Sequence, residues 1–260
     1  MLRHLSDRAS AGLFVALVLG LSLTTANVAE GLVLALSPLI AVLVMMLVVT
    51  REGHRRTGWR SCGMRRPPWS DVALAVVVPT AISVVAFGGA VLLGQAELRR
   101  PPSDWWSILL VMVATGMVLA FAEEIGWRGY LQPRLDWLGS RHSTLVVGVV
   151  WTAWHLPYIL LTPYYHADGS RPVVLALFTA SVIAFSFVFG SLRRASGSVW
   201  PAVVAHCAHN VSFALLADSF IRTDHPVVVN EYLAGDTGLL VALGAAVSAA
   251  LLARRAAPSR

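Results

Sequence analysis

Two adjacent carboxylates and an arginine interrupt a long apolar stretch, in the run EEIGWR that begins at Glu123. Residues 105–122 before it carry no charge. Ionisable groups are costly in or near a bilayer, so they are candidates for function. On a continuous helix Glu124 and Arg128 share a face, whereas Glu123 lies about 100° around the axis. We therefore expect Glu124 and Arg128 to pair and Glu123 to be left for chemistry. The simpler alternative is that both carboxylates only solvate a helix end.

Two further apolar stretches contain polar side chains. His155 lies one helical turn after Trp151, whose ring is placed to shield or orient the imidazole; a packed core histidine is the simpler alternative. His206, His209 and Asn210 lie within five residues of each other, and the first and last of these share a helical face. Such a group needs mutual partners, a water cavity or a metal, unless it serves as a polar contact between helices.

These side chains are the ordinary tools of hydrolysis. Carboxylate and imidazole activate water, and histidine and asparagine can donate hydrogen bonds to an oxyanion. With the glutamate they can also ligate a metal. Neither HExxH nor GxSxG occurs in the chain, so the pattern favours hydrolysis by activated water without a covalent intermediate. The metal candidates are Glu123, His155 and His206, with Asn210 the weakest, and the ion would be zinc or another divalent metal. A metal-free mechanism is equally open.

Apolar runs must hold these residues in place. The chain has 260 residues, 57% hydrophobic and 13% charged, whereas a soluble domain carries about 25% charged residues. A transmembrane helix needs about 20 mostly apolar residues. Eight such runs occur: 10–27, 31–50, 71–94, 105–127, 143–162, 172–192, 198–217 and 237–253. We expect an all-α, polytopic membrane protein of about eight transmembrane helices that enclose an intramembrane catalytic cavity. Residues 1–260 form a single transmembrane domain, with a motif-bearing core at about 105–217. The segment Arg128–Leu138 mixes charged and aromatic residues, which predicts an interfacial amphipathic continuation.

Arginine placement predicts the orientation. All 20 basic residues are arginines. With eight spans and both ends inside, 16 of them fall on inner segments, and only four on outer ones: Arg99, Arg100, Arg171 and Arg222. This asymmetry follows the positive-inside rule. We expect a multi-pass protein of the cell membrane with both termini in the cytoplasm. The lipid bilayer is its expected partner, and nucleic acid is not, because the positive charge lies in loops that set topology.

The three polar groups, taken in order, resemble the three motifs of the CPBP intramembrane proteases. These are the CAAX-prenyl endopeptidases and bacteriocin-processing enzymes, also called the abortive-infection family. The matching pieces are EExxxR at Glu123, an aromatic residue four positions before His155, and HxxxN at His206. The run EEIGWRGYLQPRL and the piece WHLP around His155 are especially alike. The likeness covers roughly residues 105–216.

The resemblance implies an eight-helix endopeptidase, with a cavity open toward the cytoplasm, that cleaves a membrane-associated protein or peptide substrate. Carried over by position, Glu123 and His155 would activate the water. His206 and Asn210 would hold the scissile carbonyl or its oxyanion. Such enzymes are also described as metalloprotease-like, and the residues permit both a bound metal and a metal-free glutamate.

The remaining motif residues would have supporting roles. The resemblance makes Glu124 and Arg128 a supporting pair. Trp151 stands where the family commonly has phenylalanine, and it keeps an aromatic ring there. His209 lies outside the three motifs, and its role is open.

Two other functions fit the same residues. A non-catalytic membrane scaffold or immunity protein of the same fold would be indicated by the loss of a motif residue, but every motif position is present. A transporter with a proton relay through Glu123 and the histidines would be indicated by paired discontinuous helices. The sequence shows no such pairing.

Overall fold

The chain folds into a bundle of helices that a computed structural model describes for residues 5–255. The helices are α1 (Asp7–Thr25), α2 (Leu32–Leu43), α3 (Arg56–Ser61), α4 (Trp69–Leu92), α5 (Trp105–Glu124), α6 (Gln132–Arg134), α7 (Ser140–Leu161), α8 (Arg171–Ser196), α9 (Trp200–Leu215) and α10 (Leu239–Arg255). Two short strands, β1 (Glu97–Leu98) and β2 (Ile221–Arg222), pair in antiparallel fashion, with Glu97 opposite Arg222 and Leu98 opposite Ile221.

Long apolar helices dominate the fold. Within residues 5–255, six are long and apolar enough to cross a membrane: Asp7–Thr25, Val28–Val49, Trp69–Leu92, Trp105–Arg134, Ser140–Leu161 and Arg171–Ser196. Each of the eight predicted runs contains a helix. The last two, α9 and α10, have only 16 and 17 residues, although the π-helical segment η6 (Leu216–Phe220) extends α9. The prediction of an all-α, polytopic membrane protein is confirmed, and these two shorter helices account for the difference between six and eight.

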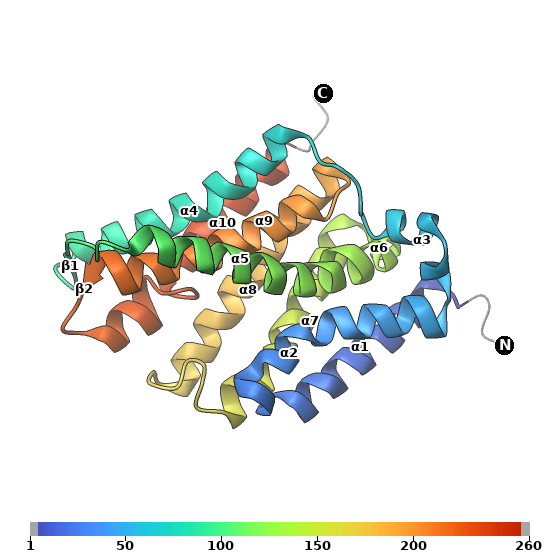
Figure 1. Ribbon diagram of the computed structural model, residues 1–260, viewed down its shortest axis with the longest axis horizontal. Coiled ribbons are helices and arrows are strands. Elements are labelled where there is room, and N and C mark those ends of the chain that lie inside the picture. The colour runs from blue at the N-terminus through green and yellow to red at the C-terminus, as the bar shows by residue number, and fades with distance from the viewer. Residues whose placement is uncertain (1–4, 256–260) are drawn as a thin grey trace.

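The helix α9 lies at the centre of the bundle. It packs against α4, α5 and α8, while α7 packs against α8 and α1, and α2 packs against α1 and α5 (Figure 1). The motif-bearing helices α5 and α9 therefore touch directly. The third, α7, meets them through α8 and through the segment that follows α5.

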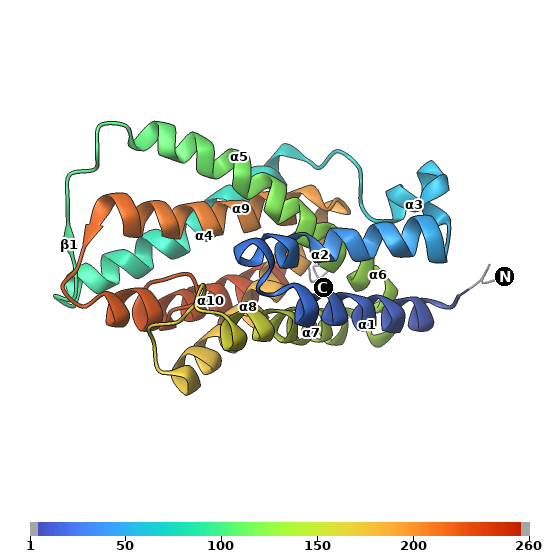
Figure 2. The ribbon, with the colours of Figure 1, turned by 60° about the horizontal axis from the view of Figure 1, so that its bottom comes forward.

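Two sets of loops gather at opposite ends of the bundle (Figure 2). At one end, Arg65 Nε donates to the Gly197 carbonyl at 2.6 Å, and Arg193 Nε donates to the Arg128 carbonyl at 3.1 Å. These bonds join the loop before α4, the end of α8 with the loop after it, and the segment after α5, which are far apart in the sequence. At the other end, β1 pairs with β2. The segments for which the arginine pattern predicts a common side are thus neighbours in space.

The regular α-helix of the first motif ends at Glu124. The next seven residues form the wider π-helical segment η4 (Ile125–Leu131), and all seven are buried. A π-helical turn inside an α-helix often marks a functional site. A Cβ atom on Gly126 would lie 2.7 Å from Pro38 Cβ of α2. Glycine at this position therefore allows α2 to approach the backbone beside the two carboxylates.

The predicted continuation of the helix beyond Glu124 is observed, but the interfacial placement of Arg128–Leu138 is not, because α1 and the loop after α2 cover most of residues 128–135. The Tyr130 ring packs against Phe14 of α1 with centroids 5.1 Å apart. Arg134 lies over the Tyr130 ring at 3.6 Å and donates to Glu52 Oε2 at 2.6 Å. The charge that suggested an interface is thus paired inside the protein.

Candidate active site

Glu124 links two helices through one carboxylate oxygen. Its Oε1 accepts a hydrogen bond from Arg128 Nη1 at 2.9 Å and another from His206 Nδ1 at 2.9 Å. The Glu124 and Arg128 side chains are completely buried, and His206 keeps only 6% of its side-chain surface. The predicted pairing of Glu124 with Arg128 is observed. The contact with His206, which joins α5 to α9, could not be read from spacing.

Glu123 has a different environment. Its Oε2 accepts a hydrogen bond from Trp151 Nε1 of α7 at 2.9 Å. Glu123 retains 8% of its surface, whereas Glu124 retains none. Adjacent positions on the helix therefore point one carboxylate into a closed ion pair and the other toward α7, where some of its surface stays accessible.

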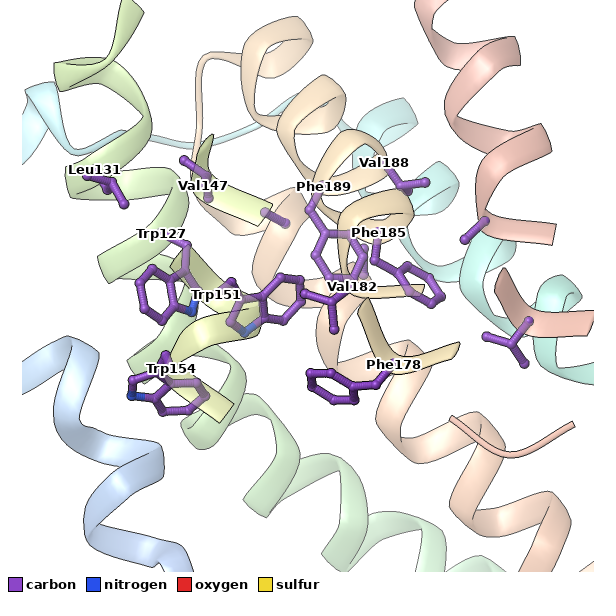
Figure 3. Packing of buried hydrophobic residues seen from close by; sticks show 14 of the residues in the cluster. Trp127, Leu131, Val147, Trp151, Trp154, Phe178, Val182, Phe185, Val188 and Phe189 are labelled. Atoms are coloured by element: carbon purple, nitrogen blue, oxygen red, sulfur yellow. The ribbon is translucent and has the colours of Figure 1, made fainter. Parts of the chain in front are cut away.

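Trp151 contacts most of the site. Besides its bond to Glu123, its ring lies 4.5 Å below the Arg128 guanidinium carbon, a cation–π arrangement, and 5.4 Å from the His206 ring in a T-shaped geometry. Figure 3 shows the Trp151 indole between Trp127 and Trp154 on one side and Phe189 on the other. The tryptophan predicted to shield or orient one imidazole thus contacts Glu123, Arg128 and the two motif histidines.

His155 is held by its own helix. Its Nδ1 lies 3.0 Å from the Trp151 carbonyl oxygen, one turn earlier. A carbonyl oxygen only accepts, so Nδ1 carries the hydrogen and Nε2 is left as an acceptor. The ring packs edge-to-face on Trp154 at 4.5 Å and on Phe178 at 4.9 Å. Within residues 5–255 no hydrogen bond joins His155 to Glu123, and Trp151 is the residue that contacts both.

His206, His209 and Asn210 differ in their surroundings although they are neighbours on α9. The His206 ring stacks on Phe189 of α8 with centroids 5.6 Å apart. Asn210 is half-buried, and no side-chain hydrogen bond of its own is found in the described part of the chain. His209 is buried against Phe185 with ring centroids 4.2 Å apart. His206 is therefore fixed at the site, Asn210 has free hydrogen-bonding capacity, and His209 packs away from the motif residues on an aromatic wall of α8.

The comparison with known proteins finds one similar family. Residues 104–212, which run from the start of α5 to most of α9 and include all three motifs, match the sequence model of the type II CAAX prenyl endopeptidase Rce1-like family. This part of the chain is therefore similar to that family, whose description is that of a CAAX prenyl endopeptidase. No curated protein matches the chain.

The candidate metal ligands do not converge as an ion would require. Among residues 5–255, no three His, Cys, Asp or Glu side chains are arranged to hold a metal ion. The mechanism below therefore derives no step through a metal.

Phe189 is a site residue that sequence reasoning missed. It stacks on His206, and its ring lies 5.2 Å from the Arg128 guanidinium carbon. Aromatic residues at helical spacing on α8 carry no signal that separates a site wall from ordinary core. Only the packing of α8 against α9 and η4 reveals this contact.

The buried pair generates a stability prediction. In an Arg128→Ala variant, Glu124 loses the guanidinium bonded to it, and an uncompensated buried charge costs about 3–5 kcal/mol. We expect a lower yield of folded protein and a lower Tm in detergent. Arg128→Lys, which keeps the charge, should recover part of the loss. An Arg128→Ala variant with wild-type Tm and no activity would instead place Arg128 in the chemistry.

Proposed function

We propose that this protein is an intramembrane endopeptidase that hydrolyses a peptide bond of a membrane-associated protein or peptide, using water activated by Glu123 and His155. The family supports the protease class. The observation that supports the mechanism is that the two glutamates have different surroundings. Glu124 is completely buried and bonded to Arg128 and His206, whereas Glu123, which keeps 8% of its surface, accepts a hydrogen bond from Trp151 and has no ion-pair partner among residues 5–255.

Glu123 acts as the general base in this proposal. Its carboxylate removes a proton from a water molecule, and the resulting hydroxide oxygen forms a bond to the scissile carbonyl carbon. Trp151 Nε1–H holds one carboxylate oxygen, so the other oxygen is the one that takes the proton. When the tetrahedral intermediate collapses, the C–N bond breaks and this proton passes to the leaving amine nitrogen. His155, with Nε2 as an acceptor, relays the proton.

His206 and Asn210 stabilise the oxyanion of the tetrahedral intermediate. The Nδ1 of His206 is committed to Glu124, which turns Nε2 away from the ion pair and, in the protonated ring, makes it a second donor. Asn210 lies one turn further along α9 and offers its amide N–H groups. Donors held in place before the reaction act without reorganisation, and each typically contributes about 100- to 1,000-fold in rate.

The substrate class follows from the location of the site. Glu123 and His155 lie on helices long and apolar enough to span a membrane, so the scissile bond must reach the membrane interior or its edge. The family description refers to prenylated CAAX substrates. For this chain we propose a membrane-associated peptide or protein, with or without a prenyl group.

A cleavage assay tests the proposal. Purified protein is incubated with a library of prenylated and unmodified peptides, and products are identified by mass spectrometry. We expect Glu123→Gln and His155→Ala to abolish cleavage with Tm unchanged, and Asn210→Ala to retain activity reduced by about 100- to 1,000-fold. His142→Ala is the matched control, because His142 lies on the same helix as His155 but is exposed at its start; its activity should equal wild type.

Two results would contradict the proposal. Cleavage that survives in Glu123→Gln would remove the general base. Folded wild-type protein that cleaves no peptide would favour the non-catalytic scaffold or immunity protein of the same fold.

A chelator tests the metal-free form of the mechanism. Cleavage that persists in a strong chelator would support the metal-free mechanism, and loss of cleavage that added zinc restores would refute it.

We further propose that the protein lies in the cell membrane with both termini in the cytoplasm. The support is the arginine asymmetry, together with the clustering of arginine-rich connecting segments at one end of the bundle. Reporter fusions after Ser70 should be cytoplasmic, and fusions after Asp224 should be external. An external Ser70 fusion would overturn this orientation.

A further inference from the structure

A second polar cluster, remote from the three motifs, joins the loop between α7 and α8 to the segment that precedes α10. We call it the loop clasp; its members are Tyr165, His166, Glu231, Asp236 and Thr237. Tyr165 donates its hydroxyl hydrogen to the Asp236 carboxylate. His166 Nδ1 lies 2.5 Å from Glu231 Oε2, and His166 Nε2 lies 3.1 Å from Thr237 Oγ1. The two segments are more than 60 residues apart in sequence, so the clasp closes a long loop.

The clasp is buried and backed by an unusual backbone. The side chains of His166, Glu231 and Asp236 are only 4%, 13% and 12% exposed. His166 has a φ angle of 52°, a left-handed conformation that a non-glycine residue keeps only where its surroundings over-determine it. Burial opposes a charge on His166, but the hydrogen bond to Glu231 and the charge of Asp236 outweigh it and raise the pKa of His166. The loop that carries Tyr165 is therefore held in one defined position.

Tyr165 brings this cluster to the proposed active site. Its ring centroid lies 6.2 Å from that of His155 and 6.0 Å from that of Phe178. Phe178 in turn packs edge-to-face on His155. His155 thus sits in an aromatic cage with walls from Trp154, Phe178 and Tyr165.

The three walls of the cage differ in how they are supported. Trp154 and Phe178 stand on the long helices α7 and α8, whose backbones hold them. Tyr165 stands on a loop, and its hydroxyl bond to Asp236 is what ties its tip to the rest of the protein. Burial and the nearby Asp236 carboxylate raise the pKa of Tyr165 well above its usual value, so the hydroxyl keeps its hydrogen and remains a donor.

We propose that Tyr165 and Asp236 are positioning residues, which hold the His155 imidazole in the orientation that the proposed peptide hydrolysis requires. Asp236 acts through Tyr165, and Tyr165 acts through ring contact, so neither needs to touch the substrate. The inference rests on the proposed function, because it assigns a purpose to the orientation of His155. It also explains why a carboxylate is buried at a loop that the three motifs do not include.

Kinetics of conservative variants test the proposal. Tyr165→Phe removes one hydroxyl and keeps the ring, and Asp236→Asn keeps the shape of the side chain. We expect each to lower kcat by roughly 10- to 100-fold, the range that a misplacement of about 1 Å can reach, with KM and Tm close to wild type. Asp236→Asn also removes the charge that faces His166 Nε2 at 3.5 Å, so Tyr165→Phe, which removes only the shared hydrogen bond, is the decisive variant.

Tyr232→Phe is the matched control. The Tyr232 hydroxyl accepts a hydrogen bond from Ser170 N at 2.7 Å, so it anchors the same loop, but Tyr232 is not part of the His155 cage. This variant should keep kcat within about twofold of wild type, as most substitutions with small structural effects do. An equal loss of kcat in Tyr232→Phe would show that the loop needs general anchoring, and it would overturn the specific role of Tyr165.

A spectroscopic measurement separates this inference from the proposed function. Protein labelled with ¹⁵N-histidine reports the His155 ring by NMR, and the His155→Ala variant assigns its signals. The signals should shift or broaden in Tyr165→Phe and Asp236→Asn and stay unchanged in Tyr232→Phe, whether or not a cleaved peptide has been found. Unchanged His155 signals in Tyr165→Phe would overturn the positioning role. If Asp236→Asn does not fold, Tyr165→Phe alone decides the question.

Discussion

The buried ion pair of Glu124 and Arg128, extended by His206, is the constraint on which the rest of the site depends. Two charges are tolerable in so apolar a bundle only when each has a partner, and here a single carboxylate oxygen serves both a guanidinium and an imidazole. The same contact sets the rotation of α5 and η4 against α9. With Glu124 directed at α9, the adjacent Glu123 must point toward α7. The ion pair thus determines which glutamate is available for the proposed chemistry.

Trp151 contacts residues of all three motifs and so connects them into one site. Its indole N–H donates to Glu123, its carbonyl accepts from His155, and its ring lies against Arg128 and His206. A phenylalanine, which the family commonly has here, would keep the ring contacts but has no N–H to donate. The tryptophan therefore adds a restraint on the proposed general base that an aromatic ring alone cannot supply. Phe189 also lines the site, because its ring stacks on the His206 ring.

Much of this could be predicted from the sequence, because the relevant signals are local. The apolar runs predicted the helices, and the four-residue spacing predicted the pair of Glu124 with Arg128. What escaped prediction depends on contacts between distant segments. The sequence of Arg128–Leu138 predicts an interfacial segment because it mixes charges with aromatic rings, but the partners that bury it, Glu52 and Phe14, lie far along the chain. Likewise, the sequence of the loop that carries Tyr165 does not predict the hydrogen bond from Tyr165 to Asp236, which lies 71 residues later.

The central claim is that two adjacent glutamates have separate tasks, and it is tested most directly by making the same substitution at each. Glu123→Gln and Glu124→Gln are isosteric, so thermal unfolding and peptide cleavage of the two purified variants can be compared at once. Glu123→Gln should unfold at the wild-type Tm and show no cleavage. Glu124→Gln should lose several degrees of Tm, because Arg128 becomes an uncompensated buried charge. A Glu124→Gln variant as stable as wild type, or a Glu123→Gln variant that still cleaves, would contradict the account.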